Sequence, residues 1–140
     1  MDPSREQVVA VFEPMLDQGQ MVRMAIALRR RQLRPSNCCL DLGTPSQVAA
    51  QLNEVGATLV VWDVSPATPY ACSVLETLLQ TRTVTARNVV VTTTDVARLV
   101  GYLGAAAGGL RIFQKPYDIA DLVLELERLG KMGQRATSAA

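Results

Sequence analysis

Three short apolar runs, each ending near a single polar side chain, constrain the fold of this chain more than any other feature. The runs cover residues 58–62, 88–92 and 110–113, and they lead to Asp63, Thr93 and Lys115. Asp63 and Thr93 are 30 residues apart, and Thr93 and Lys115 are 22 apart. Such separations fit consecutive parallel strands joined by helical crossovers. Because the carboxyl ends of parallel strands open onto one ligand-binding crevice, we expect the acid, the hydroxyl and the amine to converge there.

The rest of the chain continues this alternation of strands and helices. Its apolar runs lack the polar alternation of a half-exposed strand, which indicates a sheet covered on both faces. We therefore predict an α/β fold: a doubly wound, five-stranded parallel sheet of the flavodoxin-like type with helices on both faces. Besides the three runs, we expect strands at residues 7–12 and 37–42 and helices at 20–33, 45–55, 71–78, 96–103 and 119–129.

Helix punctuation predicts where several of these elements begin and end. Thr44 is placed to cap a helix that Gly56 ends, and Asp118 is placed to cap the last one. Gly130 should end that last helix. We therefore expect one domain over residues 1–130, followed by a flexible tail or the start of a linker at 131–140. In the first helix the core face should carry Met21, Met24, Ala25 and Leu28, and in the fourth Val96, Leu99, Val100 and Leu103.

The composition excludes several classes of protein. Hydrophobic residues make up 49% of the chain and charged residues 19%, which suits a folded domain and not a disordered one. A net charge of +1 argues against direct nucleic-acid binding. No apolar stretch is long enough for a membrane span and no signal-peptide pattern is present, so we expect a cytoplasmic protein.

Histidine is absent from the sequence. This excludes Ser-His-Asp and Cys-His catalysis, makes most transition-metal sites improbable, and means that the chain cannot donate a phosphoryl group from phosphohistidine. Any chemistry must use carboxylates, hydroxyls and lysine, and any metal it involves would be a hard cation.

Three motifs in this order resemble one family. Leu-Val-Val-Trp-Asp63, Val-Val-Val-Thr-Thr93 and Ile-Phe-Gln-Lys115-Pro116-Tyr117 are similar to the corresponding segments of the receiver domain of bacterial two-component response regulators, the CheY-like family. The resemblance extends from about Val8 to Leu129 and includes the topology of the sheet.

The resemblance implies a phosphorelay role. Asp63 would accept a phosphoryl group from the phosphohistidine of a histidine kinase or phosphotransfer protein. Thr93 would hydrogen-bond the phosphoryl oxygens, and Lys115 would pair with the phosphate. A cis bond before Pro116 would aim the lysine into the crevice. The domain would have no enzymatic activity beyond phosphorylation and dephosphorylation of its own Asp63.

The resemblance also implies a metal and a surface for output. Mg²⁺ would be bound by Glu13, Asp63 and the backbone carbonyl of Ser65, since it prefers hard oxygen ligands. A switch residue would lie at Ile112. A downstream partner or a second copy of the chain would dock on the last two helices, through a surface that includes Tyr102, Arg111 and Leu124.

Four departures from the family pattern leave an alternative open. In the acidic pair, Phe12 replaces the first residue and the longer Glu13, followed by proline, is the second; Thr94 stands where a small residue is usual, and Ile112 replaces the aromatic switch residue. The alternative is a degenerate receiver, an interaction module that works without phosphorylation. A third hypothesis is a flavodoxin-like binder of small ligands, which ranks lower because no glycine-rich phosphate loop follows the first strand.

Overall fold

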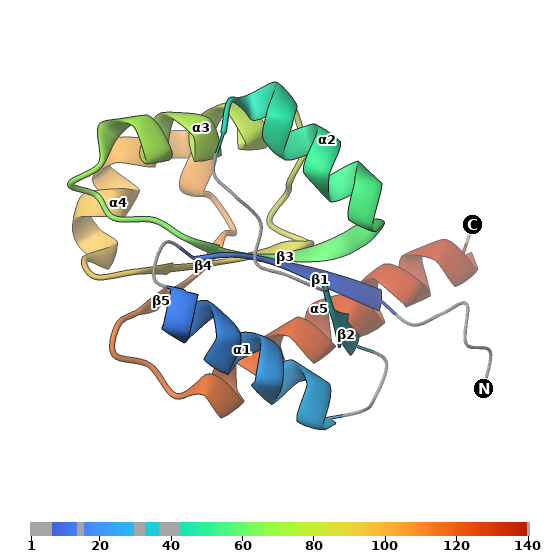
Figure 1. Cartoon of the computed structure of the whole chain (residues 1–140). Coiled ribbons are helices and arrows are strands. Elements are labelled where there is room, and N and C mark those ends of the chain that lie inside the picture. Colours follow the sequence, from blue (N-terminus) through green and yellow to red (C-terminus); the bar gives the residue numbers. More distant parts are fainter. Residues whose placement is uncertain (1–6, 14–15, 30–32, 37–42, 140) are drawn as a thin grey trace.

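A computed structural model describes residues 7–13, 16–29, 33–36 and 43–139. Its five strands form one parallel sheet in the order β2-β1-β3-β4-β5 (Figure 1), which confirms the predicted fold. The elements in chain order are β1 Gln7–Phe12, α1 Leu16–Arg29, β2 Leu33–Pro35, α2 Pro45–Val55, β3 Ala57–Asp63, α3 Pro69–Gln80, β4 Val89–Thr93, α4 Val96–Leu103, the 3₁₀ turn η2 Gly104–Ala107, β5 Arg111–Gln114 and α5 Ile119–Ala139. In the described residues no helix is long and apolar enough to cross a membrane.

The helices cover the sheet on both faces, and a separate apolar cluster fills each side. Helices α2, α3 and α4 lie on one face, and α1 and α5 lie on the other (Figure 1). We call these the α2–α3–α4 face and the α1–α5 face. Strand residues alternate between them, because successive side chains of a strand point to opposite sides. In β3, for example, Val60 and Trp62 belong to the α2–α3–α4 cluster, while Leu59 and Val61 belong to the α1–α5 cluster.

The start and end of α2 follow from its sequence as predicted. Thr44 Oγ1 accepts a hydrogen bond from the Gln47 backbone N–H, and the Gln47 side chain accepts one from the Thr44 backbone N–H. This reciprocal pair satisfies backbone donors that the first helical turn leaves without partners. Gly56 ends the helix with φ +67°, a left-handed conformation that glycine adopts without steric cost.

The second strand differs from the prediction. We expected a helix through Leu33, ended by Pro35, and a strand at residues 37–42. Instead α1 ends at Arg29 and the strand is Leu33–Pro35, while residues 37–42 lie outside the described part of the chain. Pro35 is tolerated because β2 is an edge strand, paired only with β1, where a missing N–H need not break the ladder.

The predicted core faces of two helices are partly wrong. Met21 and Met24 are 56% and 64% exposed, and α1 instead packs through Val22 and Ile26. That segment is apolar nearly all around the helix, so its spacing did not select one face. In α4, Val100 is exposed, while Leu99 and Leu103 are buried as expected.

Gly130 does not end the last helix, which continues to Ala139 and so includes most of the segment predicted as a tail. Its carbonyl accepts a hydrogen bond of 2.7 Å from Gln7 Nε2, at the start of β1. A Cβ atom at this position would lie only 3.1 Å from the same nitrogen. Gly130 thus lies inside the helix, close to Gln7, and is not a helix stop.

Candidate functional site

The carboxyl ends of β1, β3 and β4 bring polar side chains together on the α1–α5 face. Glu13 directly follows β1, Asp63 ends β3, and Thr92 lies in β4. Asp63 and Thr92 are paired in the register of the two strands. Each of these residues is two positions beyond a member of the α1–α5 cluster: Val11, Val61 and Val90. The period of two in a strand therefore places all three polar groups on one side.

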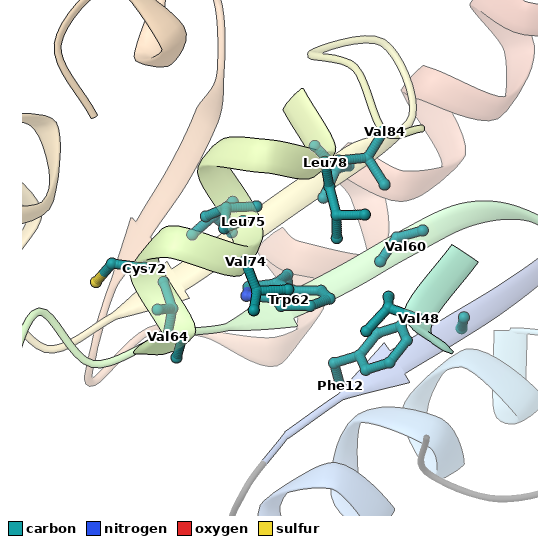
Figure 2. Close-up of a cluster of buried hydrophobic side chains, with 14 of the residues drawn as sticks. Phe12, Val48, Val60, Trp62, Val64, Cys72, Val74, Leu75, Leu78 and Val84 are labelled. Carbon is teal, nitrogen blue, oxygen red and sulfur yellow. The ribbon is translucent and has the colours of Figure 1, made fainter. Parts of the chain in front are cut away.

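The residues next to them in sequence belong to the opposite face. Phe12 and Trp62 are 3% and 1% exposed, and their rings pack with centroids 4.6 Å apart. Both belong to the cluster beneath α2 and α3 (Figure 2). Phe12, at a position where the resemblance led us to expect an acid, is thus a core residue here and contributes no charge to the site.

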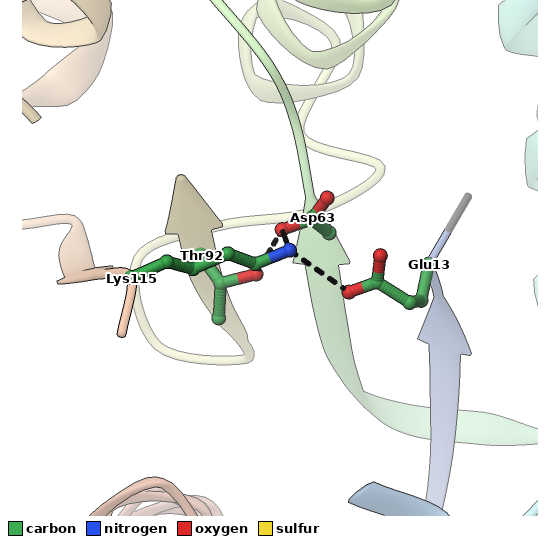
Figure 3. Close-up of polar contacts among 4 residues, drawn as sticks. All are labelled: Glu13, Asp63, Thr92 and Lys115. Carbon is green, nitrogen blue, oxygen red and sulfur yellow. Dashed lines mark hydrogen bonds and ion pairs between the residues drawn. The ribbon is translucent and has the colours of Figure 1, made fainter. Parts of the chain in front are cut away.

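Lys115, just beyond β5, lies between the two carboxylates (Figure 3). Its Nζ is 2.6 Å from Asp63 Oδ1 and 3.4 Å from Glu13 Oε2. The side chains are largely buried: 4% of Glu13, 9% of Asp63 and 18% of Lys115 are exposed. Ion pairs at such depth are screened little by salt. The formal charge of these three side chains together is −1, which makes the cluster attractive to a further cation.

Thr92 also donates a hydrogen bond to Asp63. Its Oγ1 is 2.7 Å from Asp63 Oδ1, the same oxygen that Lys115 contacts. Oδ2 accepts no hydrogen bond from any residue in the described part of the chain. One oxygen of the carboxylate is thus held by two donors, and the other is left for an incoming group.

The structure brings Asp63, Lys115 and Glu13 together, but it does not join Thr93 to them by a hydrogen bond. Thr93 Oγ1 is buried and has no hydrogen-bond partner among the described residues. Thr93 follows Val89 and Val91 at every second position of β4, and both valines belong to the α2–α3–α4 cluster. Because strand side chains alternate between the two faces, Thr93 belongs with that face and not with Asp63. Sequence analysis missed Thr92, because no signal in the sequence gives the register of β4 against β3, which pairs Thr92 with Asp63.

The two carboxylates fit a hard cation, whereas the Ser65 carbonyl does not in this arrangement. Glu13 and Asp63 provide carboxylate oxygens of the kind that Mg²⁺ accepts alongside water. The Ser65 carbonyl instead accepts hydrogen bonds from the Thr68 backbone N–H at 3.0 Å and from the Cys72 thiol at 3.5 Å. In the described residues no third acidic, histidine or cysteine side chain completes a metal-binding group.

Tyr117 lies close enough to the site for the negative charge there to affect its pKa. Burial, together with the negative charges of Glu13 and Asp63, raises the pKa of Tyr117 to about 12 from the ordinary value of 10.0. Its ring packs against Phe113, with centroids 5.9 Å apart. Tyr117 therefore stays protonated and neutral at physiological pH.

The remaining predicted residues lie around β5, at the edge of the sheet. The Lys115–Pro116 peptide bond is cis. Ile112 is half-buried and packs against the α2–α3–α4 cluster. Tyr102 on α4 and Leu124 on α5 are 45% and 51% exposed, and the exposed Arg111 lies over the Phe113 ring at 4.7 Å.

Comparison with solved structures identifies the fold. A scan against models of protein families finds no match, and neither does a search of curated proteins. Among solved structures, the receiver domain of Francisella response regulator 1452 is 16% identical with a TM-score of 0.65, over 91% of this chain and 98% of that one. A LuxR-family DNA-binding response regulator from Staphylococcus aureus is 15% identical with a TM-score of 0.63, over 89% and 98%. A CheY-like receiver domain protein from Methanospirillum hungatei is 13% identical with a TM-score of 0.62, over 92% and 98%. The chain therefore has the receiver-domain fold, and the predicted resemblance is confirmed.

Proposed function

We propose that this chain is a signalling receiver domain that accepts a phosphoryl group on Oδ2 of Asp63. The observation that carries the proposal is the asymmetry of the Asp63 carboxylate. Oδ1 is held by Lys115 and Thr92, and Oδ2 accepts no hydrogen bond from the described residues. A carboxylate fixed in this way presents one oriented nucleophilic oxygen.

The step is an in-line displacement at phosphorus. Oδ2 forms a bond to the phosphorus atom of a phosphohistidine on a partner protein while the phosphorus–nitrogen bond breaks. The electron pair of that bond returns to the imidazole ring, which leaves as neutral histidine when its other nitrogen carries a proton. Such transfers depend mainly on positioning and on compensation of charge.

Lys115 compensates charge on the Asp63 side of the reaction. Its ammonium group contacts Oδ1 and is also within reach of Glu13, so it offsets part of the negative charge that two carboxylates and a phosphoryl group bring together. Mg²⁺ bound by Glu13 and Asp63 would supply further charge neutralisation at the transferring group. Thr93 is given no role in this step: it has the parity of the α2–α3–α4 face, and its buried oxygen has no hydrogen-bond partner among the described residues.

The partners follow from this chemistry. A histidine kinase or phosphotransfer protein would donate the phosphoryl group, because the chain itself has no histidine. Output would pass to a downstream protein or a second copy of this chain through Tyr102, Arg111 and Leu124 around β5, with Ile112 as the residue that responds. We propose a cytoplasmic location, no direct contact with nucleic acid, and no reaction on molecules other than its own Asp63.

The test is chemical labelling of the purified protein. Incubation with acetyl phosphate and Mg²⁺ should add the mass of one phosphoryl group to the wild type and none to Asp63→Asn, which has nearly the same shape. A Glu54→Gln variant, which changes an exposed carboxylate on α2, should label like the wild type. An unlabelled wild type, under conditions that label an established receiver in parallel, would refute the proposal.

A second candidate function has its own supporting observation. Phe12 is built into the core against Trp62, so the site has one metal-holding carboxylate fewer than the family pattern, and Ile112 cannot act as an aromatic switch. Both features favour a receiver-fold interaction module that works without phosphorylation. It predicts an unlabelled wild type and partner binding that is the same for the wild type and Asp63→Asn.

A further inference from the structure

The chain has two adjacent threonines at the end of β4, and their surroundings differ. Both are buried: Thr92 is 0% exposed and Thr93 is 1% exposed. Only the Thr92 hydroxyl has a partner, and that partner is the carboxylate of Asp63. The two residues thus have the same chemistry, strand and burial, but one contacts the acceptor and the other has no hydrogen-bond partner among the described residues.

We propose that Thr92, and not Thr93, is the threonine that positions Asp63, and that it shortens the lifetime of the aspartyl phosphate. This inference rests on the proposed function and deepens it. Thr92 is a positioning residue: it acts through Oδ1 of Asp63 and leaves Oδ2 to bond to phosphorus.

The effect on lifetime follows from where charge resides during hydrolysis. In the phosphorylated state Oδ1 is the neutral carbonyl oxygen of an acyl phosphate. When water attacks the phosphorus atom, the bond from phosphorus to Oδ2 breaks and its electron pair returns to Asp63 as a carboxylate. The proton of the water passes to solvent, and inorganic phosphate leaves.

The hydrogen bond from Thr92 strengthens along this path. A hydroxyl donates more strongly to a charged carboxylate than to a neutral carbonyl. Because negative charge develops on the leaving carboxylate, the Thr92 bond stabilises the transition state for loss of phosphate more than it stabilises the acyl phosphate. Removal of the hydroxyl should therefore slow hydrolysis about fivefold to tenfold, the rate equivalent of the difference between one charge-assisted and one neutral hydrogen bond.

The matched experiment uses both threonines. Proteins labelled with acetyl phosphate are separated from the donor, and loss of the phosphoryl group is followed by intact mass over time. Thr92→Val should lengthen the half-life about fivefold to tenfold, and Thr92→Ser, which restores a hydroxyl, should return it to the wild-type value. Thr93→Val should stay within about twofold of the wild type, since it removes a hydroxyl that has no hydrogen-bond partner among the described residues.

The outcomes separate this inference from the proposed function. A labelled wild type with an unchanged half-life in Thr92→Val, or with the larger change in Thr93→Val, would overturn the inference alone. A wild type that takes no label would overturn the proposed function and the lifetime claim with it.

One measurement needs no variant and remains available if Thr92→Val does not fold. The hydroxyl proton of Thr92 should appear in the proton spectrum of the wild type as a slowly exchanging resonance, because it is buried and bonded to Asp63. An assigned spectrum in which Thr92 shows no such protected proton would also overturn the inference.

Discussion

At the carboxyl edge of the sheet, neighbouring residues belong to regions with opposite properties. On the α2–α3–α4 face, the rings of Phe12 and Trp62 pack at a tilt in an apolar cluster with no charge. One residue further along the same strands, Glu13 and Asp63 meet Lys115 on the α1–α5 face. Because successive side chains of a strand point to opposite faces, one residue can pack in the core while the next contributes to the polar site. The comparison predicts that changes on the first face reduce stability, while changes on the second alter charge and reactivity.

The largest expected effect is on the apolar face. Trp62→Ala should lower the free energy of unfolding by about 3–5 kcal/mol, because it removes a large buried ring that packs against Phe12. Urea unfolding measures this. Trp62→Phe is the matched control and should cost about 1–2 kcal/mol, because it leaves a smaller cavity and the lost indole N–H has no hydrogen-bond partner among the described residues. A small loss in Trp62→Ala would contradict the assignment of this face as the structural core.

Lys115 is where the polar face also contributes to stability. Lys115→Met should lower the free energy of unfolding by about 2–3 kcal/mol at neutral pH, because it leaves the largely buried Glu13 and Asp63 without the ammonium between them. Lys131→Met, at an exposed position of α5, is the control and should change it by less than about 0.5 kcal/mol. Equal stability of the two variants would show that the buried ion pairs are not formed.

Tyr117 gives the polar face a pH signature. Its pKa is about 12 in the folded protein and 10.0 for the ordinary side chain, so the folded state holds the proton more tightly. The resulting stabilisation is complete below pH 10 and is lost as pH rises to about 12. Across that window the wild type should lose about 1 kcal/mol more stability than Tyr117→Phe, after allowance for partial exposure. Parallel curves for the two proteins would contradict this placement of the hydroxyl.

The smallest expected effect on stability is at Asp63, the proposed acceptor. Asp63→Asn should change the free energy of unfolding by less than about 1 kcal/mol, because it leaves Lys115 and Glu13 as a matched pair of opposite charges. The same variant should abolish labelling. A strongly destabilised Asp63→Asn would show that Asp63 is mainly structural, and the contrast between the two faces would then fail.

The order of the elements was predictable because the strands are apolar and the helix caps are explicit. The location of the site was predictable because Asp63 ends one strand and Lys115 follows another, both at the carboxyl edge of the sheet. The finer placements did not follow, for physical reasons. The apolar residues of α1 have helical spacing on two sides of the helix, so the sequence did not select the side that is buried. Gly130 resembles a helix stop, although it lies within α5 beside Gln7.

The choice between Thr92 and Thr93 required the register of β3 and β4. The family pattern points to Thr93, and both threonines end the same apolar run. Only the pairing of Asp63 with Thr92 shows which hydroxyl lies beside Asp63. A shift of one residue along a strand moves the side chain to the other face of the sheet. The spacing of residues along the chain therefore cannot decide between Thr92 and Thr93.

The central claim is that Asp63, on the α1–α5 face, is the acceptor, and chemical trapping tests it most directly. Wild-type protein treated with acetyl phosphate and Mg²⁺ is reduced with borohydride, which converts an aspartyl phosphate to homoserine, and its peptides are then sequenced by mass spectrometry. We predict homoserine at position 63 and at no other aspartate, with none in an untreated sample. Homoserine at another aspartate, or an unmodified Asp63 in a protein that is otherwise folded, would contradict the account.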